Sequence, residues 1–390
     1  MEAKNRLDAL TGLRFLAAAA VALAHLPRLH LDPSVPLTAR RLFMEGGAGV
    51  PFFFVLSGFV LAYSYHDRLA RPSGRELARY ALSRVARLWP VYLLSVALIA
   101  LWPVGPAPSS VGAVVANLAL VQVWPPTTEV PVSLNPVAWS LSVEVFFYLA
   151  LPLFLWALAR RPGSRPWPLV CLAVAVWCVH LGLVLWHRSH LGPWTLYVCN
   201  LCPPVRLGEF GVGLLLGLAF VRGGGVGSGP TTARTRAAWT VLELAAVVLV
   251  GVTAFQSDKV SILLRLSGYY TPALGLVVAV FARQRGLLSG LMAGRVPVFL
   301  GEVSFAFFLL HVFVFIHLGT WPGADRLGSV GHSAVLAAAA LLLSAVVYRC
   351  YEAPLRAWLV GLGRPRKDRP ESRRSLLGWL RPARRAGNVG

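Results

Sequence analysis

Charged residues are scarce in this 390-residue sequence, and acidic residues are scarcest. Only 14% of the residues are charged and 56% are hydrophobic, with a mean hydropathy of +0.64. Soluble domains have about 25% charged and about 45–50% apolar residues, so the composition excludes an ordinary soluble enzyme. Because 16 acidic residues face 37 basic ones, the net charge is +21. That excess alone could indicate nucleic acid, but the hydropathy favours a lipid bilayer as the partner.

Long apolar runs indicate an all-α polytopic membrane protein. About 20 apolar residues cross the roughly 30 Å hydrocarbon core as a helix. Ten segments meet this description, so we expect a bundle of about ten transmembrane helices: 10–27, 48–65, 86–104, 138–158, 167–187, 206–221, 240–256, 267–282, 297–318 and 333–350. The apolar segment 111–124 has only fourteen residues and is predicted to be re-entrant or interfacial.

The distribution of basic residues predicts the orientation. With ten spans and a cytoplasmic N-terminus, 28 of the 37 basic residues fall in cytoplasmic segments and eight outside, while 105–137 has none. Both termini are therefore expected in the cytoplasm. We expect a transmembrane domain over 1–358 and an arginine-rich, disordered tail over 359–390. The preference for arginine over lysine is typical of high-GC bacterial genomes, which suggests a bacterial plasma membrane.

Ionisable residues at membrane depth mark candidate functional positions. Arg14 and His25 lie in the first span, roughly 16 Å apart along the axis and about 20° off one helix face. Glu144 lies roughly 9 Å inside the fourth span, at a depth close to that of His25, which makes the two expected partners. In the alternative interpretation, Arg14 extends to the inner surface, His25 ends the helix and Glu144 bonds a neighbouring helix.

Other polar residues are expected at the depth of Arg14 or at the depth of His25 and Glu144. Arg84 and Arg87 open the third span at the depth of Arg14, and three guanidiniums at one level form a candidate phosphate site. The positive-inside rule is the alternative explanation for the pair on the third span. Ser140 and Tyr148 share the helical stripe of Glu144. His311 either lines an acceptor cavity or is a core histidine.

The sequence resembles the acyltransferase-3 family of polytopic membrane acyltransferases. Six motifs carry the resemblance, in order over residues 7–354: Arg14 and His25 with ten residues between them, Gly47–Phe59, Arg84-x-x-Arg87, Trp139–Glu144 with Tyr148, Ser304–His311, and Tyr351–Pro354. The sequence departs from the family at Phe305 and Phe308, where relatives commonly have tyrosine. Relatives often carry a hydrolase-like domain after the last span. None follows here, so we expect transfer within the bundle.

The resemblance implies transfer of an acyl group, most often acetyl, from cytoplasmic acyl-CoA to a hydroxyl group. Arg14, Arg84 and Arg87 would bind the nucleotide phosphates, and His25 would act as general base with Glu144 orienting it. Ser140 or Tyr148 could stabilise the oxyanion. Ser57 could be a nucleophile, although a serine before glycine is more often a packing residue. The acceptor could be a sugar, a lipid-linked glycan, an envelope polymer or a secondary metabolite such as a macrolide.

Two further expectations concern metals and transport. No resident metal is expected, because Cys199 and Cys202 suit a disulfide or two free thiols better than a metal site. The alternative function is a transporter that uses Arg14, His25 and Glu144 as a proton or substrate relay. Paired half-helices broken by glycine or proline would favour a transporter, and we find no convincing pair. The oligomeric state does not follow from the sequence.

Overall fold

The computed structural model describes residues 6–104, 106–125, 130–159, 165–190, 192, 194–226, 232–321 and 324–363. All regular secondary structure within these ranges is helical. Nine helical segments in them are long and apolar enough to cross a membrane. They contain, in order, α4 (Gly49–Tyr65), α5 (Gly74–Leu101), α7 (Trp139–Ala159), α8 (Trp167–Ser189), α9 (Pro203–Arg222), α10 (Ala233–Phe255), α12 (Thr271–Phe281), α14 (Arg295–Leu318) and α15 (Gly328–Val347). The predicted all-α polytopic fold is confirmed.

The remaining predicted span, 10–27, corresponds to α1 (Asp8–Ala24), which has 17 residues. At 1.5 Å per residue it is about 26 Å long, at the lower end of the range for crossing a bilayer. Pro27 begins the short helix α2 (Pro27–Leu31) directly afterwards, which keeps α1 short. The segment predicted to be re-entrant or interfacial contains α6 (Val111–Leu118), whose eight residues are too few to cross.

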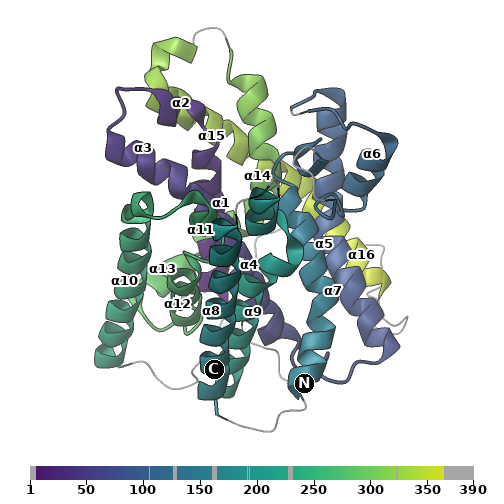
Figure 1. Ribbon diagram of the computed structural model, residues 1–390, viewed down its shortest axis with the longest axis vertical. Coiled ribbons are helices and arrows are strands. Elements are labelled where there is room, and N and C mark those ends of the chain that lie inside the picture. The colour runs from purple at the N-terminus through teal and green to yellow at the C-terminus, as the bar shows by residue number, and fades with distance from the viewer. Residues whose placement is uncertain are drawn as a thin grey trace, which may run out of the picture.

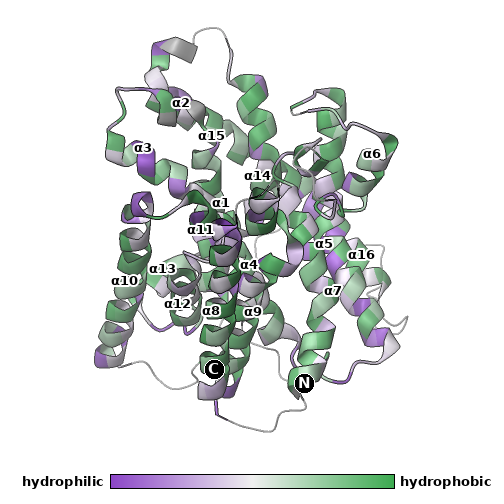
Figure 2. Ribbon diagram, viewed as in Figure 1, coloured by the Kyte–Doolittle hydropathy of each residue, from purple (hydrophilic) through white to green (hydrophobic). Residues whose placement is uncertain are grey.

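The remaining short helices lie between or beside the long ones. They are α3 (Leu37–Met44), α11 (Ile262–Leu266), α13 (Leu287–Met292) and α16 (Ala353–Leu362). In Figure 1, α2 and α3 lie near one end of the bundle and α10 stands at its edge. Figure 2 shows hydrophobic residues along most of the long helices. The domain boundary expected at residue 358 falls inside α16, and residues 364–390 of the expected tail lie outside the described ranges.

Small residues bring two helix pairs into close contact. A Cβ atom at Gly213 of α9 would lie 1.9 Å from the Val55 carbonyl oxygen of α4. A Cβ atom at Gly301 of α14 would lie 1.8 Å from the Thr11 carbonyl oxygen of α1. Only glycine allows backbones to approach so closely, a common device between membrane helices. These contacts fix α1 and α4 within the bundle.

Candidate active site

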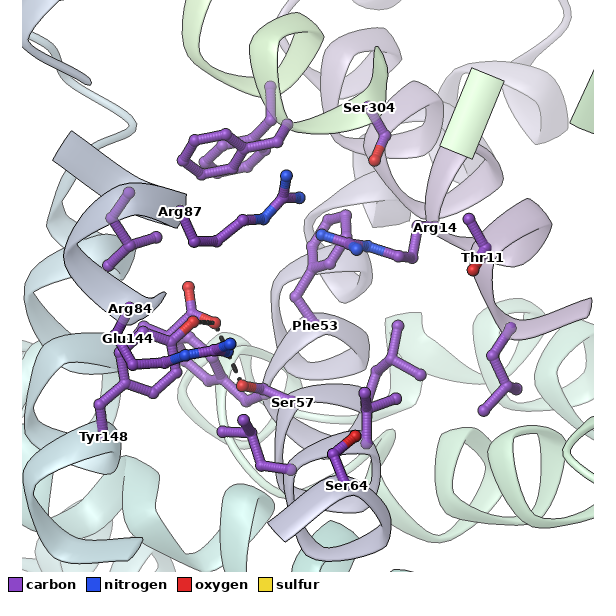
Figure 3. A pocket seen from close by; sticks show the side chains of 18 of the residues that line it. Thr11, Arg14, Phe53, Ser57, Ser64, Arg84, Arg87, Glu144, Tyr148 and Ser304 are labelled. Atoms are coloured by element: carbon purple, nitrogen blue, oxygen red, sulfur yellow. Dashed lines mark hydrogen bonds between the residues drawn. The ribbon is translucent and has the colours of Figure 1, made fainter. Parts of the chain in front are cut away.

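A polar cavity of about 490 Å³ lies between α1, α4, α5, α7 and α14. Seven of the nine residues nominated from the sequence line it: Arg14, Ser57, Arg84, Arg87, Ser140, Glu144 and Tyr148. In Figure 3, Arg14 extends from one side of this space, with Arg84 and Arg87 on the other. The three arginines that the sequence grouped together therefore line one cavity. The two nominated histidines, His25 and His311, are not among the lining residues.

The three arginines differ in how their charge is balanced. Within the described ranges, the side chain of Arg14 forms no hydrogen bond or ion pair. Arg87 Nη1 lies 2.7 Å from Glu352 Oε1, and the carboxylate of Glu352 is fully buried. The Nη2 atom of Arg87 is also buried, and it lacks a hydrogen-bond partner among the described residues. Because Arg14 has no counter-ion among these residues and Arg87 has a buried N–H group without an acceptor, an anion in the cavity would satisfy both.

Arg84 is held by aromatic rings. Its Cζ atom lies 5.6, 5.9 and 5.4 Å from the ring centroids of Tyr65, Tyr80 and Tyr148. Its Nη2 atom also donates a hydrogen bond of 3.4 Å to the Tyr65 hydroxyl oxygen. Aromatic faces attract the guanidinium without neutralising it, so Arg84 keeps its full positive charge.

Glu144 contacts hydroxyl groups and not the imidazole that the sequence suggested. Its Oε1 atom accepts a hydrogen bond of 2.6 Å from Tyr148 and one of 3.1 Å from Ser57. Figure 3 shows Ser57 and Glu144 joined in this way. The expectation that Glu144 orients His25 is wrong. Asp8, Leu10, Thr11 and Arg14 of the first half of α1 line the cavity with Glu144, whereas His25 follows the far end of α1.

The two histidines form a pair of their own. His25 Nδ1 lies 2.8 Å from the Val21 carbonyl oxygen and 3.4 Å from His311 Nε2. The buried His311 places its Nδ1 2.8 Å from the Phe308 carbonyl oxygen. Because a carbonyl oxygen only accepts, we assign the proton to Nδ1 in both rings. The single Nδ1 proton of His25 is then shared between the Val21 carbonyl oxygen and the more distant His311 Nε2, and His25 Nε2 is the nitrogen able to take a proton.

The remaining nominated positions have mainly local contacts. The Ser140 hydroxyl donates a hydrogen bond of 3.1 Å to the Val137 carbonyl oxygen, one turn back. Phe305 places its ring 4.7 Å from Arg87 Cζ, so this departure from the family supplies a cation–π contact in place of a hydroxyl.

Cys199 and Cys202 are free thiols. Among the residues with described positions, no group of three or more His, Cys, Asp and Glu is placed to hold a metal ion.

Sequence reasoning did not single out two buried acidic residues. Glu209 of α9 lies 3.2 Å from Arg206, with both side chains buried. Glu243 of α10 accepts hydrogen bonds from the backbone N–H groups of Gly286, Leu288 and Ser289, which caps α13. Each is the one acidic residue of an apolar helix, the same signal that drew attention to Glu144. Neither residue lines the cavity.

The fold and the cavity together define a multi-pass membrane protein with an internal cationic site. The model of the acyltransferase-3 family, described as an acyltransferase domain, matches residues 7–349. The chain therefore belongs to this family, and it is a membrane acyltransferase.

Two relatives agree with this assignment. Acyltransferase MdmB of Streptomyces mycarofaciens is 32% identical over 354 residues, which cover 87% of this chain and 86% of the relative. A putative acetyltransferase, ORF330, of Acidianus two-tailed virus is 26% identical over 356 residues, covering 90% of this chain and 91% of the relative. No solved structure matches the chain.

Proposed function

We propose that this protein is an O-acyltransferase that moves an acetyl group from cytoplasmic acetyl-CoA to a hydroxyl group of an acceptor. The observation that carries the proposal is the cavity, into which two different helices direct three arginines. Arginine forks bind phosphate oxygens at two points, and a CoA thioester carries several phosphates. Arg14, Arg84 and Arg87 would hold these phosphates.

The direction of entry follows from the rest of the lining. Arg6 and Asp8 at the start of α1, together with Arg356 of α16, belong to the cavity wall. All three lie in segments that the distribution of basic residues assigns to the cytoplasm. The donor would therefore enter from the cytoplasmic face, with its phosphates near this entrance and its thioester directed along α1 toward His25.

The reaction proposed at His25 is direct transfer. His25 Nε2 accepts the proton of the acceptor hydroxyl while that oxygen attacks the thioester carbonyl carbon. The C–S bond then breaks, CoA leaves as the thiol after taking up the proton, and the acyl ester of the acceptor remains. His311 acts as a positioning residue, since its Nε2 holds the Nδ1 side of His25. Glu144 keeps the Ser57 and Tyr148 hydroxyls in place on the cavity wall.

The acceptor is proposed as a class. A hydroxyl of a carbohydrate, a glycolipid, an envelope polymer or a secondary metabolite such as a macrolide would serve. The protein would carry out the reaction in a bacterial plasma membrane, surrounded by lipid.

Purified protein in lipid nanodiscs, supplied with radiolabelled acetyl-CoA and a panel of hydroxylated acceptors, tests the proposal. We expect CoA release to depend on the acceptor, with the label recovered as an ester. In proteoliposomes, movement of an unmodified solute with no thioester turnover would contradict the proposal and favour a transporter.

Replacing Arg14 with alanine is expected to raise KM for acetyl-CoA by about 10–150-fold, the equivalent of about 1.5–3 kcal/mol for hydrogen bonds to a charged group. Thermal stability should change little, because the Arg14 side chain forms no hydrogen bond or ion pair within the described ranges. Steady-state kinetics at several salt concentrations check this result. Arg75→Ala, which removes an exposed arginine outside the cavity, is the control. An equal KM in Arg14→Ala and wild type would remove Arg14 from the donor site.

A further inference from the structure

Two phenylalanines stand between the cavity and the histidine pair. Phe53 of α4 and Phe308 of α14 both line the cavity, and their ring centroids are 6.0 Å apart in an edge-to-face arrangement. Phe308 also places its ring centroid 6.1 Å from that of His311, which contacts His25. The contacts therefore run in one line from the cavity wall through Phe308 to the histidines.

Phe53 of α4 lies opposite Phe308 of α14, in contact with its ring. It is half-buried and packs against two separate apolar clusters. One cluster contains Phe308 with other residues of the cavity wall and Val21 of α1, while the other contains Ala18 and Ala22 of the same helix. Phe53 therefore lies where the cavity wall meets the outer half of α1. Arg14 and Glu144 line the cavity, and His25 does not.

We propose that Phe53 and Phe308 form an aromatic barrier that sets the length of the acyl group transferred. The proposal rests on the proposed function, because it takes the cavity as the donor site and His25 as the base. With the phosphates at the arginines, the thioester must meet His25 at this barrier. An acetyl group adds one methyl group there, whereas each further methylene must occupy space that the two rings already fill. The barrier therefore favours acetyl over longer chains.

The close packing of the two rings determines how strongly the barrier should discriminate between acyl chains. Protein interiors are close-packed, so the two rings leave little room for extra atoms without displacement. One methylene in a hydrophobic pocket changes discrimination by about 10–200-fold. Replacing one phenylalanine with alanine leaves a ring-sized gap, which a longer acyl chain can fill. We expect the ratio of kcat/KM for hexanoyl-CoA to kcat/KM for acetyl-CoA to rise by at least about tenfold.

The experiment compares acetyl-, butyryl- and hexanoyl-CoA with wild type, Phe53→Ala, Phe308→Ala and the milder Phe53→Leu and Phe308→Leu. Phe59→Ala is the matched control, because Phe59 lies on the same helix as Phe53 and is buried but does not line the cavity, and its ring packs on Phe220. The ratio is measured within one preparation, so a smaller active fraction cancels. We expect both alanine variants to shift the ratio toward hexanoyl-CoA, the leucine variants to shift it less, and Phe59→Ala to leave it unchanged.

Two results would contradict the proposal that Phe53 and Phe308 form this barrier. One is an unchanged ratio in all four variants at Phe53 and Phe308. The other is an equal shift in Phe59→Ala, which would show general loosening of the bundle. A wild-type protein that transfers no acyl group from any donor would instead refute the proposed function. The two failures are therefore distinguishable.

Discussion

Replacing His25 with alanine is expected to lower kcat by about 10²–10⁴-fold, the usual contribution of a general base. The tautomer leaves Nε2 of His25 as the proton acceptor, since its Nδ1 faces the Val21 carbonyl oxygen and His311 Nε2. KM for acetyl-CoA should change little, because the proposed phosphate ligands are the arginines of the cavity and His25 does not line that cavity. Acetyl transfer measured under saturating donor and acceptor gives kcat directly.

Two companion variants make this result specific. His317→Ala removes an exposed histidine near the end of α14 and should leave kcat unchanged. His311→Gln should retain more activity than His311→Ala, because a glutamine carbonyl can accept the Nδ1 proton of His25 as His311 Nε2 does. Full activity in His25→Ala would exclude His25 as the base. Equal activity in the two His311 variants would exclude the positioning role of His311.

The helical architecture could be predicted because it depends on local properties of the chain. Apolar runs of sufficient length gave the spans, and their ends agree with the helices within a few residues for segments such as 138–158 and 297–318. The grouping of Arg14 with Arg84 and Arg87 was also predictable. Arg14 lies in the first half of α1, but α5 begins at Gly74, so Arg84 and Arg87 lie ten and thirteen residues past its first residue and not at its start as expected.

The failed pairing of Glu144 with His25 has a physical reason. Residue spacing gives depth along a helix axis, but it does not say which helices are neighbours. Here α1 packs against α14, so His25 contacts His311, while Glu144 of α7 contacts Ser57 of α4. Lateral neighbours depend on close approaches such as Gly301 against Thr11, which involve residues hundreds of positions apart.

Glu352 also shows that spacing along the chain does not identify the partner of a buried residue. Its nearest basic neighbours in the chain are Arg349 and Arg356, which spacing along a helix would favour as partners. In the structure its shortest ion pair is to Arg87, 265 positions away, and Arg356 lies at 3.9 Å. The π-helical turn Tyr348–Glu352 places this carboxylate at the end of α15, next to α5. The cationic wall of the cavity therefore depends on a contact that no local pattern indicates.

This contact predicts that Arg87→Ala destabilises the protein as well as weakening donor binding. Arg87 is 14% exposed and Glu352 is 0% exposed at the side chain, so the variant leaves a buried carboxylate without its closest cation. Loss of one partner of a buried ion pair costs about 3–5 kcal/mol. We expect a clear fall in the thermal unfolding midpoint of the purified protein, together with a higher KM for acetyl-CoA.

A double variant separates the two effects. Arg87→Met with Glu352→Leu removes both charges and fills a similar volume, a change that is often neutral or stabilising for a buried ion pair. The thermal midpoint should recover to near the wild-type value, whereas KM for acetyl-CoA should stay high because the cavity still lacks one guanidinium. If KM recovers together with stability, Arg87 serves only to neutralise Glu352, and the donor phosphates are held by Arg14 and Arg84 alone. If neither recovers, the pair positions α5 against α16 through its charges, and the donor site is built on that contact.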